Sequence, residues 1–423
     1  MSYVLFFIYL VLFSWLLTKS HFICHSALSS KIIVSLFVLK IITGCVHAWI
    51  LLQRSSLPDT IVFHKEGLIE YHLLFSHPLE YLSNLFHSGY KTGYAGLFSS
   101  TDSYWNDLTS NLLIKFLSLC DIFSFGNYYI NVIFYNYVIF FGAIGLYRVF
   151  NMVYANKKYL IIATCFLLPS PLFFSSTIHK EGLIYAAIGI AVFNIFTALN
   201  KTGFTAGRIT CILLAAGFIF LQRNYVLFAL LPAAVAWILS ARKKYPPLLT
   251  FIITYLLGGL LFFTAGKLSL QLNLPAKVAQ KQRDFEHLQT PSTYIKLDSL
   301  APTFKSFVFN APQAISHSLL RPYFTDYKLS RSLLPLSVEL LLYQLLVLLF
   351  IFFRNKTSPL DPFMLFGLFF SFSILLIIGY TIPVIGAIVR YRSIYLPFIL
   401  TPVICNINWQ KIKSSIQIKN KII

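Results

Sequence analysis

The stretch "RITCILLAAGFIFLQRNYVLFALLPAAVAWILS", residues 208–240, decides how the chain is organised. It is apolar almost throughout, and it is too long for a single helical crossing of a bilayer, which takes about 20 residues. The polar triplet "QRN" at 222–224 divides it into two shorter runs. Because basic clusters flank both ends, the stretch crosses a membrane twice or not at all. We expect two crossings, with Arg223 at the turn between them.

The rest of the chain has the same character. Of its 423 residues, 57% are hydrophobic and only 11% are charged, whereas soluble domains are about 25% charged. The mean hydropathy is +0.73. This composition predicts an all-α, polytopic transmembrane helical bundle that forms one integral membrane domain over residues 1–423. The apolar runs predict about eleven spans, near 2–18, 31–52, 129–149, 159–176, 182–199, 208–221, 225–240, 247–266, 333–353, 362–380 and 393–406.

The distribution of charge predicts the topology. The formal net charge is +20, but the basic residues are scattered between spans and form no basic domain, so nucleic acid is not an expected partner. Eleven spans place six basic clusters on one side, and the positive-inside rule makes that side cytoplasmic. The N-terminus is then outside and the C-terminus inside. The clusters are Lys19/Lys31, Arg148/Lys157/Lys158, Lys201/Arg208, Arg242/Lys243/Lys244, Arg354/Lys356 and Lys411/Lys413/Lys419/Lys421.

Two long segments face outward in this topology. The first outer loop, 53–128, holds seven of the 14 acidic residues, and its apolar spacing predicts surface helices at 78–88 and 106–119. The second, 267–332, is mainly basic and ends in a predicted surface helix near 304–319. Helices with one apolar face lie on a membrane surface.

Charged residues at the outward turns are the candidate site. They are Asp102 and Asp107 in "TDSYWND", His179, Lys180 and Glu181 in "HKE", Arg223, Arg321, and Arg390 and Arg392 in "VRYR". If these turns converge, they form one cavity with carboxylates and cations on facing walls. Guanidinium groups match phosphate oxygens, and a carboxylate can take a proton from an attacking hydroxyl. Simpler interpretations compete: snorkelling arginines, a solvated "HKE" turn, and loop acids that keep the loop soluble.

Motifs of other chemistries are missing from the sequence. It contains no HExxH metal motif, Walker A loop, GxGxxG or GxSxG. We therefore expect neither a bound metal nor another cofactor. Lys40 lies within the second predicted span, and the sequence offers no explanation for it.

Three stretches resemble a known family. They are "STDSYWNDLTSNLLIKFLSL" (100–119) followed by "FGNYYINVIFYN" (125–136), "PSPLFFSSTIHKEGLI" (169–184), and "GYTIPVIGAIVRYRSIYLPF" (379–398). Together with the first outer loop they resemble the polytopic membrane glycosyltransferases of the GT-C superfamily, in particular bacterial members of the surface-polysaccharide type.

The resemblance implies sugar transfer from a polyprenyl-phosphate donor to a cell-surface glycan or lipid acceptor. Transfer would occur at the outer face of a bacterial inner membrane, with inversion and usually without a metal. The family's catalytic carboxylate maps to the acidic first loop, at Asp102 or, closer to the first outward-leading span, at Asp59, with Asp107 as a further candidate. The phosphate-binding cations map to Lys180, Arg223, Arg390 and Arg392.

Three rival functions stay open. One is a non-catalytic scaffold within a surface-assembly complex, which would not need Arg223 or "HKE" at outward turns. An O-antigen or capsule polymerase is also polytopic with two large outer loops, although no outer-face arginine here is followed by glycine eleven positions later, as is common in such polymerases. A flippase for lipid-linked oligosaccharides would show Gly- or Pro-broken spans in matching halves. "PSP" at 169–171 is one such break, and the sequence shows no partner for it.

Overall fold

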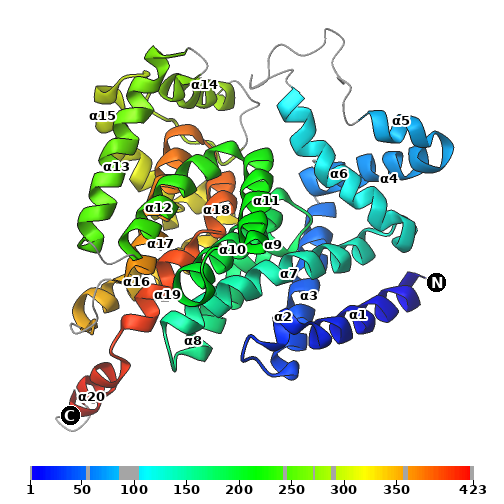
Figure 1. The fold of residues 1–423 in the computed structure, drawn as a ribbon, viewed down its shortest axis with the longest axis horizontal. Coiled ribbons are helices and arrows are strands. Elements are labelled where there is room, and N and C mark those ends of the chain that lie inside the picture. The colour runs from blue at the N-terminus through cyan, green and yellow to red at the C-terminus, as the bar shows by residue number, and fades with distance from the viewer. Residues whose placement is uncertain are drawn as a thin grey trace. The chain divides into compact units, whose positions relative to one another are not determined.

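The computed structural model in Figure 1 describes residues 2–53, 58–84, 104–241, 245–269, 272–286, 292–355 and 361–419. Regular structure in these residues is helical, and no strand forms among them beyond two isolated β-bridges, Tyr294 with Val384 and Arg354 with Ile407. The all-α prediction is therefore confirmed. Internal contacts divide the chain into unit 1 (Met1–Met152 and Phe166–Leu227) and unit 2 (Val153–Cys165 and Phe228–Ile423). The interpretation as one integral membrane domain stays a prediction.

Unit 1 begins with the N-terminal helices of the chain. Its helices are α1 (Ser2–Lys19), α2 (His21–Cys24), α3 (Ser30–Leu52), α4 (Asp59–Ser76), α5 (Pro78–Ser83), α6 (Tyr104–Ser124), α7 (Tyr128–Val153), α9 (Pro169–Ser176), α10 (Lys180–Thr197) and α11 (Ala206–Gln222). Helix α12 (Asn224–Ala241) begins in unit 1, which ends at Leu227, and continues into unit 2. Unit 2 also holds α8 (Lys158–Ile162), α13 (Pro247–Thr264), α14 (Leu274–Glu286), α15 (Phe304–Ile315), α16 (Leu333–Phe353), α17 (Pro362–Thr381), α18 (Ile385–Ser393), α19 (Leu396–Asn406) and α20 (Trp409–Lys419).

Eight of the described helices are long and apolar enough to cross a membrane, or up to ten spans if each of two bent pairs counts as one. The eight are α1, α3, α7, α10, α12, α13, α16 and α17, the first bent pair is residues 158–167 with α9, and the second is α18 with α19. The remaining predicted span, 208–221, is the shorter apolar helix α11. Every predicted span is thus helical, and the apolar helices indicate a membrane protein. Its orientation and host membrane stay predictions.

One prediction about helix position is wrong. The sequence analysis put Arg390 and Arg392 in a short turn before a span at 393–406, but both lie in the last turn of α18. The apolar residues Ile385, Ile388 and Val389 are buried at helical spacing, which draws the segment into a helix. The bend of 63° comes after the arginines, where α19 begins with a proline in its first turn.

Several helices begin or break at capping residues and prolines. Asp361 caps α17 by accepting a hydrogen bond from the Phe363 amide at 2.7 Å, and Pro362 occupies the first helical position. Thr303 caps α15 in the same way. In the first bent pair the backbone turns by 49° before Pro169, because proline lacks the amide hydrogen that would continue the helix.

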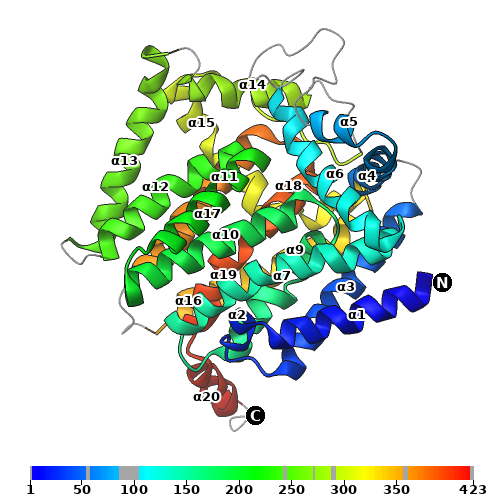
Figure 2. The ribbon, with the colours of Figure 1, turned by 45° about the vertical axis from the view of Figure 1, so that its right-hand side comes forward.

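Glycines bring spans α7 and α10 into close contact (Figure 2). A Cβ atom added to Gly142 would lie 2.2 Å from the Cα of Ala186, and one added to Gly189 would lie 2.1 Å from the Gly142 carbonyl oxygen. Small residues let transmembrane helices approach at backbone distance, where dispersion replaces the hydrophobic effect as the attraction. This contact helps fix α10, whose first turn carries "HKE".

The segment 53–128, predicted as the first outer loop, is more helical than the sequence analysis expected. Helix α4 occupies residues that the sequence analysis left as loop, and it packs along α6. The predicted helix at 106–119 is confirmed and extends over all of α6, while the helix predicted at 78–88 is found as α5 (Pro78–Ser83), and residues 85–88 lie outside the described residues. Gly67 makes the α4–α6 contact possible, because a Cβ there would lie 3.0 Å from the Cβ of Leu117.

The surface helix predicted near 304–319 forms as α15, but its apolar residues divide between two sides. Phe307 and Ala314 are buried against Tyr380 of α17, and Gly379 of α17 approaches the Ala314 backbone. Phe304 and Val308 remain exposed. One flank of α15 is therefore packed inside unit 2 and the other is open.

Candidate functional site

The break between α11 and α12 holds a buried ion pair. Arg223 lies in extended backbone between the two helices, which confirms that "QRN" divides the 208–240 stretch. Its Nη2 is 2.6 Å from Oε1 of Glu181, and its Nη1 donates to the Tyr225 hydroxyl at 2.8 Å. The Arg223 side chain is 13% exposed and that of Glu181 is 2% exposed. Such a pair in an apolar helical protein marks a functional candidate.

The start of α10 places Lys180 against α4 and α6. His179 is extended at the N-cap, and its carbonyl accepts a hydrogen bond from the Tyr135 hydroxyl. The Lys180 ammonium donates to Ser110 of α6 at 3.3 Å and lies 5.6 Å from the ring centroid of Phe63 on α4. The start of α10 thus contacts α4, α6 and the α11–α12 break, and these contacts form one polar cluster within unit 1.

Further polar side chains are buried next to this turn. The His47 imidazole stacks on Phe173 at 3.7 Å between ring centroids, and its Nδ1 is 2.5 Å from the Thr177 hydroxyl. The His47 and His179 rings are 6.3 Å apart. Polar groups in an apolar interior need such partners, because an unsatisfied one costs several kcal/mol in hydrocarbon, on the order of 2–7 kcal/mol.

The structure explains Lys40. This residue of α3 is 4% exposed, and its ammonium donates to the hydroxyls of Ser175 at 2.9 Å and Ser176 at 3.1 Å. Both serines end α9, so Lys40 joins α3 to the segment that leads into the "HKE" turn. A cation placed this way is rare in a span and is a functional candidate in its own right.

The structure also brings together a pair that the sequence analysis missed. Asp121, near the end of α6, is fully buried, and its Oδ1 accepts hydrogen bonds from Asn131 at 2.6 Å and Ser124 at 3.2 Å. Its Oδ2 has no hydrogen-bond partner in the described part of the chain, nor has Nδ1 of His64 on α4. The ring of His64 meets that of Tyr128 edge to face, with 5.3 Å between centroids.

Burial shifts the pKa values of both groups. Burial raises the pKa of Asp121 above its usual value, and the hydrogen bond from Asn131 and the charge of His64 oppose this shift. Burial lowers the pKa of His64, and the charge of Asp121 opposes that shift. The two groups therefore favour each other's charged form, which is a common arrangement in proton transfer.

Three predicted cations belong to unit 2. Arg321 pairs with Asp326 at 3.1 Å and lies over the Tyr323 ring, and Arg390 donates to the Tyr391 hydroxyl at 3.1 Å. Arg392 is 4% exposed and donates to the backbone carbonyls of Ser318 at 2.8 Å and Arg321 at 2.5 Å. Its guanidinium thereby ties α18 to the chain after α15.

The predicted residues fall into three groups. His179, Lys180, Glu181 and Arg223 come together in unit 1, while Arg321, Arg390 and Arg392 lie in unit 2. Among the proposed bases, Asp59 is exposed at the start of α4. Asp102 lies outside the described residues, and the backbone of Asp107 is part of α6 while its side chain lies outside them. A single cavity formed by all of them stays a prediction.

A sequence signal for the missed pair exists in retrospect. Asp121 is the one acid in the apolar run 112–126, and "HKEG" at 64–67 supplies both the histidine and the glycine that lets α4 approach it. Among the side chains that the structure describes, no group of three or more His, Cys, Asp or Glu is placed to hold a metal ion.

Comparison with known proteins gives no match: no protein-family model, curated protein or solved structure matches the chain. Fold and site define the class only as far as an all-α membrane protein with a buried polar site in unit 1. The resemblance to GT-C glycosyltransferases stays a prediction.

Proposed function

We propose that the protein is a membrane glycosyltransferase that moves a sugar from a polyprenyl-phosphate donor to a cell-surface glycan or lipid acceptor, at the outer face of the membrane. The observation that carries the proposal is the meeting of Lys180, Glu181 and Arg223 where α10 begins and the 206–241 segment breaks. Three charged side chains lie together there, in a chain of which 57% of the residues are hydrophobic.

The cations suit a phosphate bound to a lipid. Lys180 and Arg223 carry two positive charges against one negative charge on Glu181, and the positive end of the helix dipole of the 18-residue helix α10 lies at the same turn. Arg223 is held by Glu181 and Tyr225, so its guanidinium is already oriented. Orientation before binding lowers the entropy cost of recognising a phosphate.

The transfer needs one base and no redox chemistry. The acceptor hydroxyl oxygen attacks the anomeric carbon, the bond from that carbon to the phosphate oxygen breaks, and the polyprenyl phosphate leaves with the electron pair. The hydroxyl proton passes to a carboxylate of the first outer loop, for which Asp59, Asp102 and Asp107 are the candidates. His64 on α4 and Asp121 on α6 belong to the two helices that the Lys180 ammonium contacts, and they offer an alternative proton acceptor.

The test compares surface glycans of cells that lack the protein with cells that carry variants. Arg223→Ala and Lys180→Ala should fail to restore the missing sugar, whereas Lys201→Ala, a charge removal at the exposed far end of the same helical segment, should restore it. Expression of each variant is checked in isolated membranes. Full restoration by both site variants would refute the site.

One observation supports the flippase as a second candidate. The sequence showed a single broken span, but the chain forms two, at 158–176 and 385–406. Discontinuous helices in two parts of a chain are typical of transporters. Accumulation of lipid-linked oligosaccharide on the inner leaflet of deletion cells would favour this function over transfer, and unpolymerised single repeat units would favour an O-antigen or capsule polymerase.

A further inference from the structure

We propose that the open flank of α15 is a binding site for an anionic phospholipid of the surrounding membrane. The acyl chain lies along Phe304, Val308, Phe309 and Pro312, and Lys305 binds the headgroup phosphate. The proposal concerns unit 2 alone and does not depend on the proposed sugar transfer.

The contacts of α15 place it at the ends of two membrane spans. The Phe304 and Phe307 rings meet that of Phe263, one residue before the end of α13, at 5.4 and 5.5 Å between centroids. On the other side, the Tyr380 hydroxyl donates to the Phe307 carbonyl at 2.7 Å, one residue before the end of α17. A helix fixed to the last turns of two spans lies at the level where hydrocarbon gives way to headgroups.

The open flank is apolar and exposed. Phe309 is 83% exposed, Phe304 66% and Val308 55%, and with Lys305 and Pro312 they line a shallow hollow of about 610 Å³. Water would penalise this surface by about 25 cal/mol for each Å² of apolar area. The apolar interior of a bilayer removes that penalty, so lipid is the occupant that the position of α15 favours.

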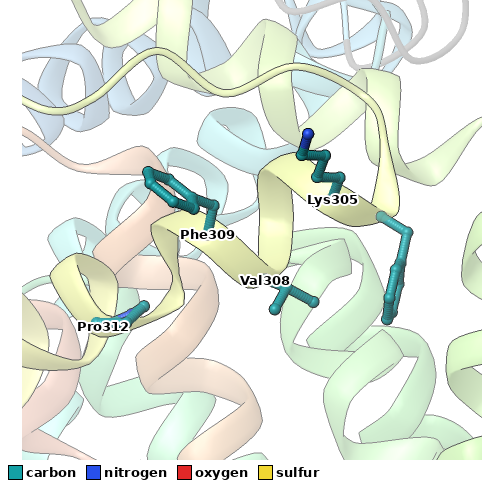
Figure 3. A pocket seen from close by; sticks show the side chains of 5 residues that line it. Lys305, Val308, Phe309 and Pro312 are labelled. Atoms are coloured by element: carbon teal, nitrogen blue, oxygen red, sulfur yellow. The ribbon is translucent and has the colours of Figure 1, made fainter.

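Lys305 supplies the polar end of the site. Figure 3 shows Lys305 and Val308 projecting in opposite directions from the same turn of α15. Phe309, four residues further on, projects to the same side as Lys305 (Figure 3), so an acyl chain that lies along Phe309 ends close to the ammonium. The surrounding segment 267–332 holds nine basic and four acidic residues, so its charge attracts anionic rather than zwitterionic headgroups.

The first experiment measures where the flank lies. Full-length protein with its exposed cysteines removed (Cys24→Ser, Cys211→Ser) receives a spin label at Phe309→Cys or, as control, at Lys281→Cys on the polar helix α14, and is placed in phosphatidylcholine vesicles with phosphatidylglycerol. We expect the label at 309 to collide mainly with oxygen, which dissolves in lipid, and the label at 281 mainly with a water-soluble nickel complex. A label at 309 that favours the nickel complex would overturn the proposal.

The second experiment measures the phosphate contact. Phosphatidylglycerol that remains bound to the purified protein is quantified by native mass spectrometry for wild type, Lys305→Gln and the exposed control Lys328→Gln in the same segment. We expect about a fivefold loss of affinity for Lys305→Gln, the effect of one basic residue near a headgroup, and no loss for Lys328→Gln. An equal loss of phosphatidylglycerol affinity in both variants would show that the lipid responds only to the total positive charge of the segment, and would refute the site. Since both lysines are exposed, elution at the wild-type volume in gel filtration verifies that the variants are folded.

Discussion

Removing Arg223 should destabilise unit 1 more than neutralising Glu181. The two side chains are 2.6 Å apart at the nearest atoms, but Glu181 is 2% exposed and Arg223 13%. Arg223→Ala therefore leaves the buried Glu181 carboxylate without its guanidinium partner. Glu181→Gln instead leaves the Arg223 guanidinium, which reaches water and keeps its hydrogen bond to the Tyr225 hydroxyl. The asymmetry in exposure sets the order of the two effects.

The magnitudes follow from the burial. Unit charges about 4 Å apart attract by about 4 kcal/mol at an effective dielectric constant of about 20, and breaking a buried pair by removing one partner costs about 3–5 kcal/mol. We expect Arg223→Ala to lower the free energy of unfolding by about 3–4 kcal/mol. Glu181→Gln still accepts a hydrogen bond, so it should cost about 1–2 kcal/mol. The double variant has no isolated buried charge. Adding Glu181→Gln to Arg223→Ala should therefore recover about 2 kcal/mol of the stability that Arg223→Ala loses.

The assay is SDS-titrated unfolding in mixed micelles, on wild type, the two single variants and the double variant. The coupling energy of this cycle isolates the pair from the other contacts of each residue. Additive losses, with a coupling below about 0.5 kcal/mol, would show that the pair does not form in the folded protein. That result would also remove the basis for Arg223 as an oriented phosphate ligand.

Three further predictions concern other parts of unit 1. Lys40→Met replaces a buried ammonium by an apolar side chain of similar length and should raise the free energy of unfolding by about 1 kcal/mol. Lys40→Ala leaves a cavity and should lower the free energy of unfolding by about 2–3 kcal/mol. Equal losses for the two variants in SDS titration would contradict this prediction. Asp121→Asn should flatten the pH dependence of thermal unfolding: because burial raises the pKa of Asp121, the folded protein keeps a proton that the unfolded chain releases, so wild-type stability falls as pH rises from about 4. Parallel pH profiles for wild type and Asp121→Asn would exclude this contribution of Asp121 to stability. His64 should have the opposite effect: because burial lowers its pKa, the stability of the folded protein falls as pH falls below about 6.5. Gly142→Ala should destabilise by about 1–3 kcal/mol or more because its Cβ meets Ala186, while the control Gly217→Ala, with nothing within 4 Å, should be neutral or stabilising; similar effects of both would show that α7 and α10 are not in backbone contact.

The local breaks of the chain were the part of the site that the sequence predicted. "QRN" and "HKE" interrupt apolar runs, and both mark helix ends: Arg223 separates α11 from α12, and "HKE" forms the N-cap and first two residues of α10. "VRYR" looked similar but lies inside α18, because its neighbours Ile388 and Val389 are buried at helical spacing. Local polarity alone does not separate a turn from the polar face of a buried helix.

The sequence by itself determined the helical class of this protein and nearly all of its apolar helices. In hydrocarbon every backbone amide and carbonyl must bond within its own segment, so a long apolar run has one stable local structure whatever surrounds it. The tertiary structure alone decided which charges meet. Glu181 and Arg223 are 42 residues apart, Lys40 and Ser175 are 135 apart, and Asp121 gains His64 only because Gly67 lets α4 approach α6. Such pairs depend on how helices pack, and packing is set by small residues and shape rather than by the hydropathy that defines each helix.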